Sequence, residues 1–153
     1  MSDEDVTSER RKNLSKAGRV EWLLGMISEL GHESRRIFQI IEPAMFFLLD
    51  VGNANELPRD YIEHITRLRT STNELREFIR WGPIPESEYE NRLADMGQGI
   101  SAFIDKAEPS VSFLESVDVR EAQGLPANYT KWVGRLRMAI SEFREALDWY
   151  TSA

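Results

Sequence analysis

Carboxylate and histidine side chains offer the first chemistry that this sequence could perform. Carboxylate-bridged two-metal sites in helical bundles use a single Glu from each of two helices and a Glu-x-x-His pair from each of the other two. Glu42 and Glu108 could supply the single carboxylates, and Glu29-Leu-Gly-His32 supplies one such pair. The sequence contains no second Glu-x-x-His pair, which weakens the case for a metal site. A metal- or small-molecule-binding bundle that uses Glu29, His32, Glu42 and Glu108 is therefore our alternative hypothesis and not the favoured one.

The residue types give little support to nucleophilic catalysis. The chain has no Cys and two His, at positions 32 and 64, and neither has a neighbouring Ser in a nucleophile pattern. The segment Gly97-Gln-Gly99-Ile-Ser-Ala102 imitates a dinucleotide-binding fingerprint, but that fingerprint works only between a strand and a helix, and no strand pattern precedes it. We therefore expect a protein that is not an enzyme and that carries no cofactor.

A tandem repeat determines which elements would position these residues. Residues 56–81 align without a gap on residues 124–149 at an offset of 68 and share ten identities. Chance would give about one or two at ordinary residue frequencies. The identical pairs are Leu57/Leu125, Pro58/Pro126, Tyr61/Tyr129, Arg67/Arg135, Leu68/Leu136, Arg69/Arg137, Glu74/Glu142, Arg76/Arg144, Glu77/Glu145 and Trp81/Trp149. Such self-similarity predicts a duplicated structural unit.

The repeat extends upstream at a slightly different offset. Residues 42–48 align on residues 108–114 at an offset of 66, so the second copy has two additional residues between Leu114 and Leu125. Insertions are tolerated in loops, which places a connection there. We divide the chain into repeat one, residues 14–81, and repeat two, residues 82–153, each with a long first segment, a loop and a second segment.

Apolar spacing predicts that both segments of each repeat are helices. Along the second segments the stripe residues step by 4, 3, 4, 3 and 4 positions, as on the buried face of an amphipathic helix. These residues are Tyr61, Ile65, Leu68, Thr72, Leu75 and Ile79 in repeat one, and Tyr129, Val133, Leu136, Ile140, Phe143 and Leu147 in repeat two. We expect helices over 58–81 and 126–150, with the prolines just inside their starts, and a long helix from about Ser15 to Leu49.

Pro43 and Pro109 occupy equivalent positions inside the long first segments. A proline inside a helix removes one hydrogen bond and clashes with the preceding turn, so we expect a kink at each. The alternative is two separate helices that meet at Glu42-Pro43. The predicted fold class is all-α: an antiparallel four-helix bundle with pseudo-twofold symmetry, in which residues 58–81 pack against residues 126–150.

Duplicated charged residues flank the predicted stripe. Arg67 and Glu74 of repeat one recur as Arg135 and Glu142 of repeat two. Residues at twofold-related places can form reciprocal ion pairs, which would join Arg67 to Glu142 and Arg135 to Glu74. The alternative is that both sets are solvated on two inherited helix faces.

Composition and charge narrow the classes of partner. The net charge of −7 argues against nonspecific binding to DNA or to an anionic membrane, and no apolar run approaches the roughly 20 residues needed to cross a bilayer. Residues 1–13 are polar and lack the apolar stretch of a secretory signal, so we expect a disordered tail, a single helical domain over 14–153 and a cytoplasmic location. The basic run from Arg10 to Arg19 supports a further alternative, a small helical subunit of a nucleoprotein complex.

The differences between the repeats point to a partner-binding surface. Three apolar residues of repeat one are replaced by polar residues in repeat two: Ile40 by Lys106, Phe46 by Ser112 and Leu49 by Glu115. If the repeats pack equivalently, these three residues and the adjacent Met45 form an exposed apolar patch, which monomers rarely leave open. Our favoured hypothesis is a non-enzymatic interaction module or adaptor that binds another protein or, as a homodimer, a second copy of itself. The alternative is that the N-terminal tail or the long first helix covers the patch.

Overall fold

The computed structural model describes residues 16–51, 57–79, 83–117 and 125–152. These residues form the α-helices α2 (Lys16–Val51), α3 (Tyr61–Phe78), α4 (Tyr89–Ser116) and α5 (Tyr129–Ser152), and a short 3-10 helix, η1 (Glu86–Glu88), directly precedes α4. None of the described residues forms a strand. The predicted all-α class and the number of long helices are therefore confirmed, whereas the predicted tail over residues 1–13 lies outside the described residues.

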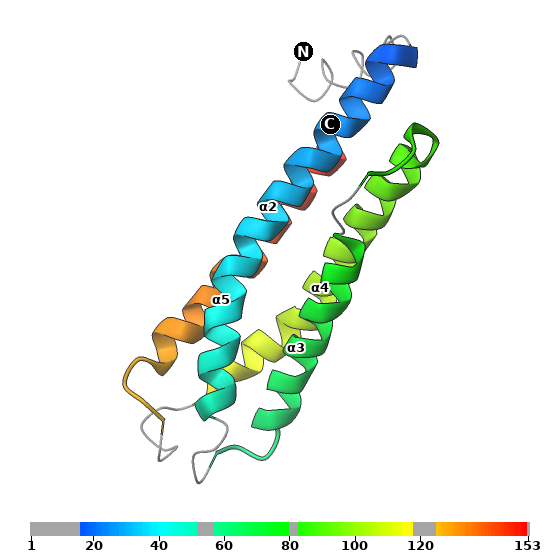
Figure 1. The fold of residues 1–153 in the computed structure, drawn as a ribbon. Helices are drawn as coiled ribbons and strands as arrows, with labels where there is room; N and C mark the ends of the chain where they lie inside the picture. Colours follow the sequence, from blue (N-terminus) through cyan, green and yellow to red (C-terminus); the bar gives the residue numbers. More distant parts are fainter. Residues whose placement is uncertain (1–15, 52–56, 80–82, 118–124, 153) are drawn as a thin grey trace.

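The chain reverses direction at each connection, so that consecutive helices run in opposite directions (Figure 1). The most extensive contacts join α2 to α5 and α3 to α4, and α4 also packs on α5. The expectation that residues 58–81 pack against residues 126–150 is wrong, because α3 and α5 make little contact. An apolar stripe shows which face of a helix is buried, but several neighbours can bury the same face.

Buried side chains from all four helices form one apolar cluster. The predicted stripe residues of α3 and α5, and Ile79 directly after α3, are buried, except that Leu147 is half-buried, and all of the buried ones but Thr72 belong to this cluster. Aromatic rings connect the helix pairs at the centre, where Phe143 of α5 meets Phe103 of α4 and Phe38 of α2 edge-on at ring-centroid distances of 5.2 and 5.9 Å. The faces that the spacing assigned to the core are therefore confirmed.

The second helix of each repeat begins three residues later than the sequence predicted. The backbone N–H of Tyr61 donates to the carbonyl of Pro58 at 3.0 Å, and that of Tyr129 donates to the carbonyl of Pro126 at 3.1 Å. Each proline therefore closes a turn ahead of the helix and does not lie just inside its start. The first of these helices ends at Phe78, three residues before the predicted end at Trp81, which itself lies outside the described residues.

The long helices continue through their internal prolines. α2 contains Pro43 and α4 contains Pro109, each within one unbroken helix. The alternative of two separate helices meeting at Glu42-Pro43 is therefore wrong. Within the described part of the chain, no helix has both the length and the apolar content that crossing a bilayer requires.

Two glycines of α4 allow aromatic rings to approach its backbone. A Cβ at Gly97 would lie 2.5 Å from the ring of Tyr150 on α5, and a Cβ at Gly99 would lie 2.8 Å from Cγ of Phe78 on α3. Side chains cannot approach so closely without displacement, so both glycines serve close packing of α4 against its neighbours. The segment that imitates a dinucleotide fingerprint therefore has a structural use here.

Candidate functional site

A groove of about 450 Å³ lies between the C-terminal half of α2 and the C-terminal half of α3. Its lining residues are Ile41, Glu42, Met45, Phe46 and Leu49 from α2 and Arg69, Thr72, Asn73 and Arg76 from α3. Phe46 is 79% exposed, whereas Met45 is buried and Leu49 is half-buried. The exposed ring of Phe46 thus lies beside an apolar floor formed by Ile41, Met45 and Leu49. Three of the four predicted partner-binding residues line the same groove.

The fourth predicted residue, Ile40, does not line this groove. Its side chain is half-buried and packs against the apolar core. Ile40 precedes Phe46 by six positions, which places it about 120° around a helix with 100° per residue. The two residues therefore belong to different faces of α2, and the predicted patch is narrower than the sequence comparison suggested.

The wall of the groove contributed by α3 is polar. Arg76 forms an ion pair with Glu42 across the groove. The Thr72 hydroxyl donates to the Leu68 carbonyl at 2.7 Å. Arg69, by contrast, is exposed and has no ion pair with any carboxylate in the described part of the chain. The groove therefore combines an apolar floor with an arginine whose charge is available to a ligand.

The aligned region of repeat two has a different arrangement. Arg137, which aligns with Arg69, lies 2.6 Å from Glu108 and 2.6 Å from Glu115, and its Nη2 donates to the Ser112 hydroxyl at 3.2 Å. The hydrogen bond from Arg137 holds the pKa of Glu108 below its usual range, and the nearby charge of Arg144 acts in the same direction. Hydrogen bonds to Glu115 and Glu108 raise the pKa of Arg137 in turn. Repeat two therefore neutralises this arginine within the chain.

The lowered pKa of Glu108 predicts a small loss of stability in acid. A carboxylate whose pKa is depressed in the folded state stabilises the protein above its unfolded pKa, and this contribution is lost as the pH falls through the folded pKa. Replacing Glu108 with Gln should therefore reduce the acid dependence of the unfolding free energy below about pH 4.5. The effect should be at most about 1 kcal/mol, because the carboxylate is partly exposed and screened by solvent.

Urea unfolding of the wild type and of Glu108→Gln between neutral pH and about pH 3 measures this contribution. Glu42→Gln is the matched control from repeat one, because Glu42 is 57% exposed and, among the residues that the structure describes, forms an ion pair only with Arg76. Equal acid dependence in the wild type and in Glu108→Gln would show that Arg137 does not stabilise the ionised Glu108.

The residues of the alternative metal site do not come together. Glu42 is paired with Arg76, and Glu108 is paired with Arg137. Glu29 and His32 are exposed on α2. Across the described segments, no three His, Asp or Glu side chains gather closely enough to hold a metal ion. This arrangement therefore does not support the metal hypothesis.

The two predicted pairings of Arg67 and Arg135 are wrong. Arg67 forms an ion pair with Glu63, one turn earlier on its own helix. The guanidinium of Arg135 lies over the Trp132 ring, at 4.4 Å from its centroid. Because α3 and α5 make little contact, neither arginine reaches the glutamate of the other repeat.

The two glutamates do form ion pairs between repeats, although with other partners. Glu74 of α3 lies 2.6 Å from Lys106 of α4, and Glu142 of α5 lies 3.0 Å from Arg36 of α2. These partners belong to the helices against which α3 and α5 actually pack. The sequence identified the right glutamates but could not identify the neighbouring helix.

A buried tyrosine anchors the end of the first helix in each repeat. The Tyr61 hydroxyl donates to the Leu48 carbonyl at 2.8 Å, and the Tyr129 hydroxyl donates to the Leu114 carbonyl at 2.9 Å. Burial raises the pKa of both phenols, and the pKa of Tyr61 is raised further by the charge that Tyr129 would carry. The four residues occupy aligned positions of the sequence repeat.

His64 contacts a serine that the sequence did not connect with it. Its Nδ1 lies 3.1 Å from the Ser110 hydroxyl, and its ring stacks on Phe113 at 4.2 Å. Ser110 is fully buried, so its hydroxyl cannot reach a substrate. At the aligned position Trp132 stacks on Phe47 at 5.2 Å. His64 and Trp132 are therefore packing residues, and the serine contact went unnoticed because 46 positions separate its members.

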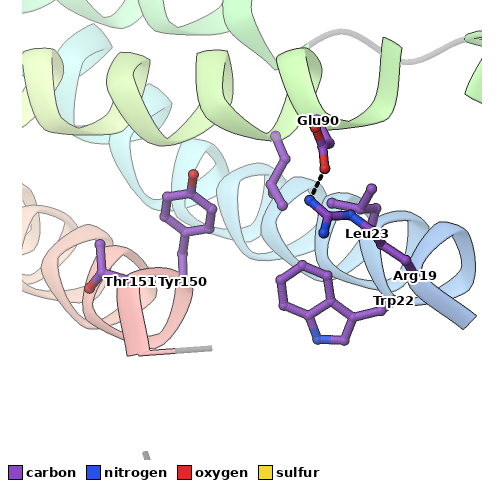
Figure 2. Close-up of a pocket in the computed structure, with 7 residues that line it drawn as sticks. Arg19, Trp22, Leu23, Glu90, Tyr150 and Thr151 are labelled. Atoms are coloured by element: carbon purple, nitrogen blue, oxygen red, sulfur yellow. Dashed lines mark hydrogen bonds and ion pairs between the residues drawn. The ribbon is translucent and has the colours of Figure 1, made fainter. Parts of the chain in front are cut away.

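A second hollow, of about 550 Å³, lies where the first turns of α2 meet the start of α4 and the end of α5. Figure 2 shows Arg19 directed at Glu90, with Trp22 beside them and Tyr150 and Thr151 approaching from α5. Arg19 belongs to the basic run considered for nucleic-acid binding, but it forms an ion pair with Glu90. Its charge is thus neutralised within the protein, and residues 10–15 of the run lie outside the described residues.

Comparison with known proteins does not assign this arrangement to a family. Searches with protein-family models, among curated proteins and among solved structures find no match for this chain. The groove between α2 and α3 is therefore interpreted from its own residues and contacts.

Proposed function

We propose that this protein is a non-enzymatic interaction module or adaptor whose groove between α2 and α3 receives an apolar side chain of a partner protein. The observation that carries the proposal is the exposure of Phe46, which is 79% accessible beside Met45 and Leu49 in a preformed groove. Aromatic residues that become buried in well-packed pockets are the usual anchors of protein interfaces. A partner that covers this ring would remove its apolar surface from water.

We propose further that the bundle arose by tandem duplication, with pseudo-twofold related repeats and with long helices kinked at Pro43 and Pro109. Two recurring features support this proposal: the tyrosine anchors at Tyr61 and Tyr129, and ion pairs at aligned positions. These ion pairs are Arg76 with Glu42 and Arg144 with Glu108. On this view the groove is a specialised feature of repeat one, because its apolar residues have polar counterparts in repeat two.

The proposal predicts that a double variant, Phe46→Ser with Leu49→Glu, keeps its helix content and loses partner binding. Both substitutions install the residues found at the aligned positions of repeat two. Truncation of interface anchors typically costs about 2 kcal/mol or more, which is over tenfold in affinity. A photo-reactive amino acid at position 46 would identify the contacting protein, and calorimetric titration of that protein with wild type and variant would measure the loss.

Ile62→Ser provides the matched control, because Ile62 is also an exposed apolar residue, at 51%, and does not line the groove. It should leave binding unchanged. Sedimentation of the wild type and of the double variant tests whether a second copy of the chain is the partner. Unfolding of the double variant would place these side chains in the core, and unchanged partner binding and unchanged assembly would reject the groove as a docking site.

A further inference from the structure

Arg69 in the groove and Arg137 at the aligned position of repeat two have different surroundings. Arg137 contacts two carboxylates and a hydroxyl, those of Glu108, Glu115 and Ser112. Arg69 lies in the groove, where Phe46 and Leu49 stand in place of Ser112 and Glu115. Arg69 therefore lacks two of the polar partners that Arg137 has in repeat two.

The remaining carboxylate of the groove does not replace them. Glu42 aligns with Glu108, but in repeat one it pairs with Arg76, whereas Glu108 pairs with both Arg137 and Arg144. The groove thus contains two guanidinium groups and one carboxylate, on a chain whose net charge is −7. A local positive charge beside exposed apolar surface favours a ligand that is both acidic and apolar.

From these contacts we infer that the groove binds an acidic amphipathic helix of a partner protein. A Glu or Asp of that helix pairs with Arg69, and an apolar side chain three or four positions away, on the same helix face, packs on Phe46 and Leu49. Repeat two contains an ion pair of the kind proposed here, because Glu115 of α4 lies 2.6 Å from Arg137 of α5. The inference rests on the proposed function, and it specifies the chemistry of the partner.

Selection from a display library of helical peptides tests the inference with a defined probe. Peptides retained by the wild-type protein should be enriched in Asp or Glu three or four positions from Leu, Phe or Trp. Each selected peptide is then resynthesised with its acidic residue replaced by the corresponding amide, and affinities are measured by fluorescence anisotropy at low and at physiological salt.

A double-mutant cycle isolates the proposed ion pair. Loss of the peptide carboxylate should weaken binding to the wild type about two- to fivefold, the range of a solvent-exposed ion pair. It should change binding to Arg69→Gln little. Arg67→Gln is the matched control, because Arg67 is an exposed arginine of α3 outside the groove, and it should behave as the wild type. Leu49→Glu should also abolish the acidic preference, because it supplies Arg69 with an internal carboxylate as Glu115 does for Arg137.

The outcomes separate the inference from the proposed function. Peptides that require Phe46 but show no preference for acidic residues would reject the inference and leave the docking groove in place. Peptides that bind equally well to Phe46→Ser would reject both. Selection of no peptide, together with a wild-type dimer that Phe46→Ser dissociates in sedimentation, would identify the occupant as a second copy of this chain and overturn the inference. Selection of no peptide with a monomeric wild type would overturn it as well.

Discussion

Replacement of Leu68 or Leu136 with alanine should lower the free energy of unfolding by about 2–5 kcal/mol for each substitution, as buried large-to-small changes do. The two leucines are 2% and 3% exposed and lie at the middle of the buried faces of α3 and α5. Truncation of the isobutyl side chain to a methyl group loses the transfer free energy of the removed carbons and leaves a cavity that the rigid neighbours fill only in part. If the repeats are pseudo-symmetric, the two losses should be similar in size.

Urea or thermal unfolding of each variant measures the loss. Ile62→Ala and Met138→Ala are the matched controls, because these side chains of the same two helices are both 51% exposed. Exposed substitutions of this kind usually change stability by less than about 0.5 kcal/mol. If the melting temperature of Leu68→Ala or Leu136→Ala matches that of the wild type, the assignment of that residue to the core is wrong.

The protein should also lose stability steeply above pH 10. In the unfolded chain both Tyr61 and Tyr129 titrate near 10.0, whereas burial raises the pKa of each in the folded state. The folded protein therefore retains protons that the unfolded chain releases, so the stabilisation is fully present below pH 10 and decreases as the pH rises toward the folded pKa. One such group gives a slope of about 1.4 kcal/mol per pH unit, and the two together about 2.7.

The test follows the unfolding free energy between pH 8 and about pH 11.5, with tyrosinate absorbance as a direct measure of ionisation. The double variant Tyr61→Phe with Tyr129→Phe should lack this part of the slope. At neutral pH the variant should lose about 1–3 kcal/mol per site, because the carbonyls of Leu48 and Leu114 lose their donors in the interior. Folded protein whose four tyrosines all ionise near pH 10 would contradict the burial of these two hydroxyls.

The sequence alone predicted the local structure well. The stripe from Tyr61 to Ile79 and its counterpart in repeat two indicated two helices and the faces that they bury, because helical periodicity depends only on residues a few positions apart. Apolar residues also keep helical spacing across Pro43, at Ile41, Ala44 and Leu48. This spacing favours an uninterrupted helix, which α2 is. The helix starts were misplaced by three residues because a proline can lie inside the first turn or close the turn before it.

The candidate site was predicted in part. Comparison of the two repeats singled out Phe46 and Leu49, because replacement of an apolar residue by a polar one marks a position that faces water. Met45 was included as their neighbour, and all three line one groove, although Met45 itself is buried. The same comparison also included Ile40, which lies on another face of α2, and it passed over Arg69. Arg69 is identical in both repeats, so a search for differences could not find it. Its significance comes from its neighbours, which only the structure shows.

Only the tertiary structure decided which helices and side chains meet. The periodic spacing of a stripe sets the direction in which a helix buries its side chains, but the choice of neighbour depends on how the whole core packs. For this reason Glu74 and Glu142 pair with Lys106 and Arg36 rather than with the predicted arginines, and Arg69 has no carboxylate partner among the described residues while Arg137 has two. The sequence determined four amphipathic helices and an exposed Phe46, and the packing of α2 against α3 placed that ring and Arg69 in one groove.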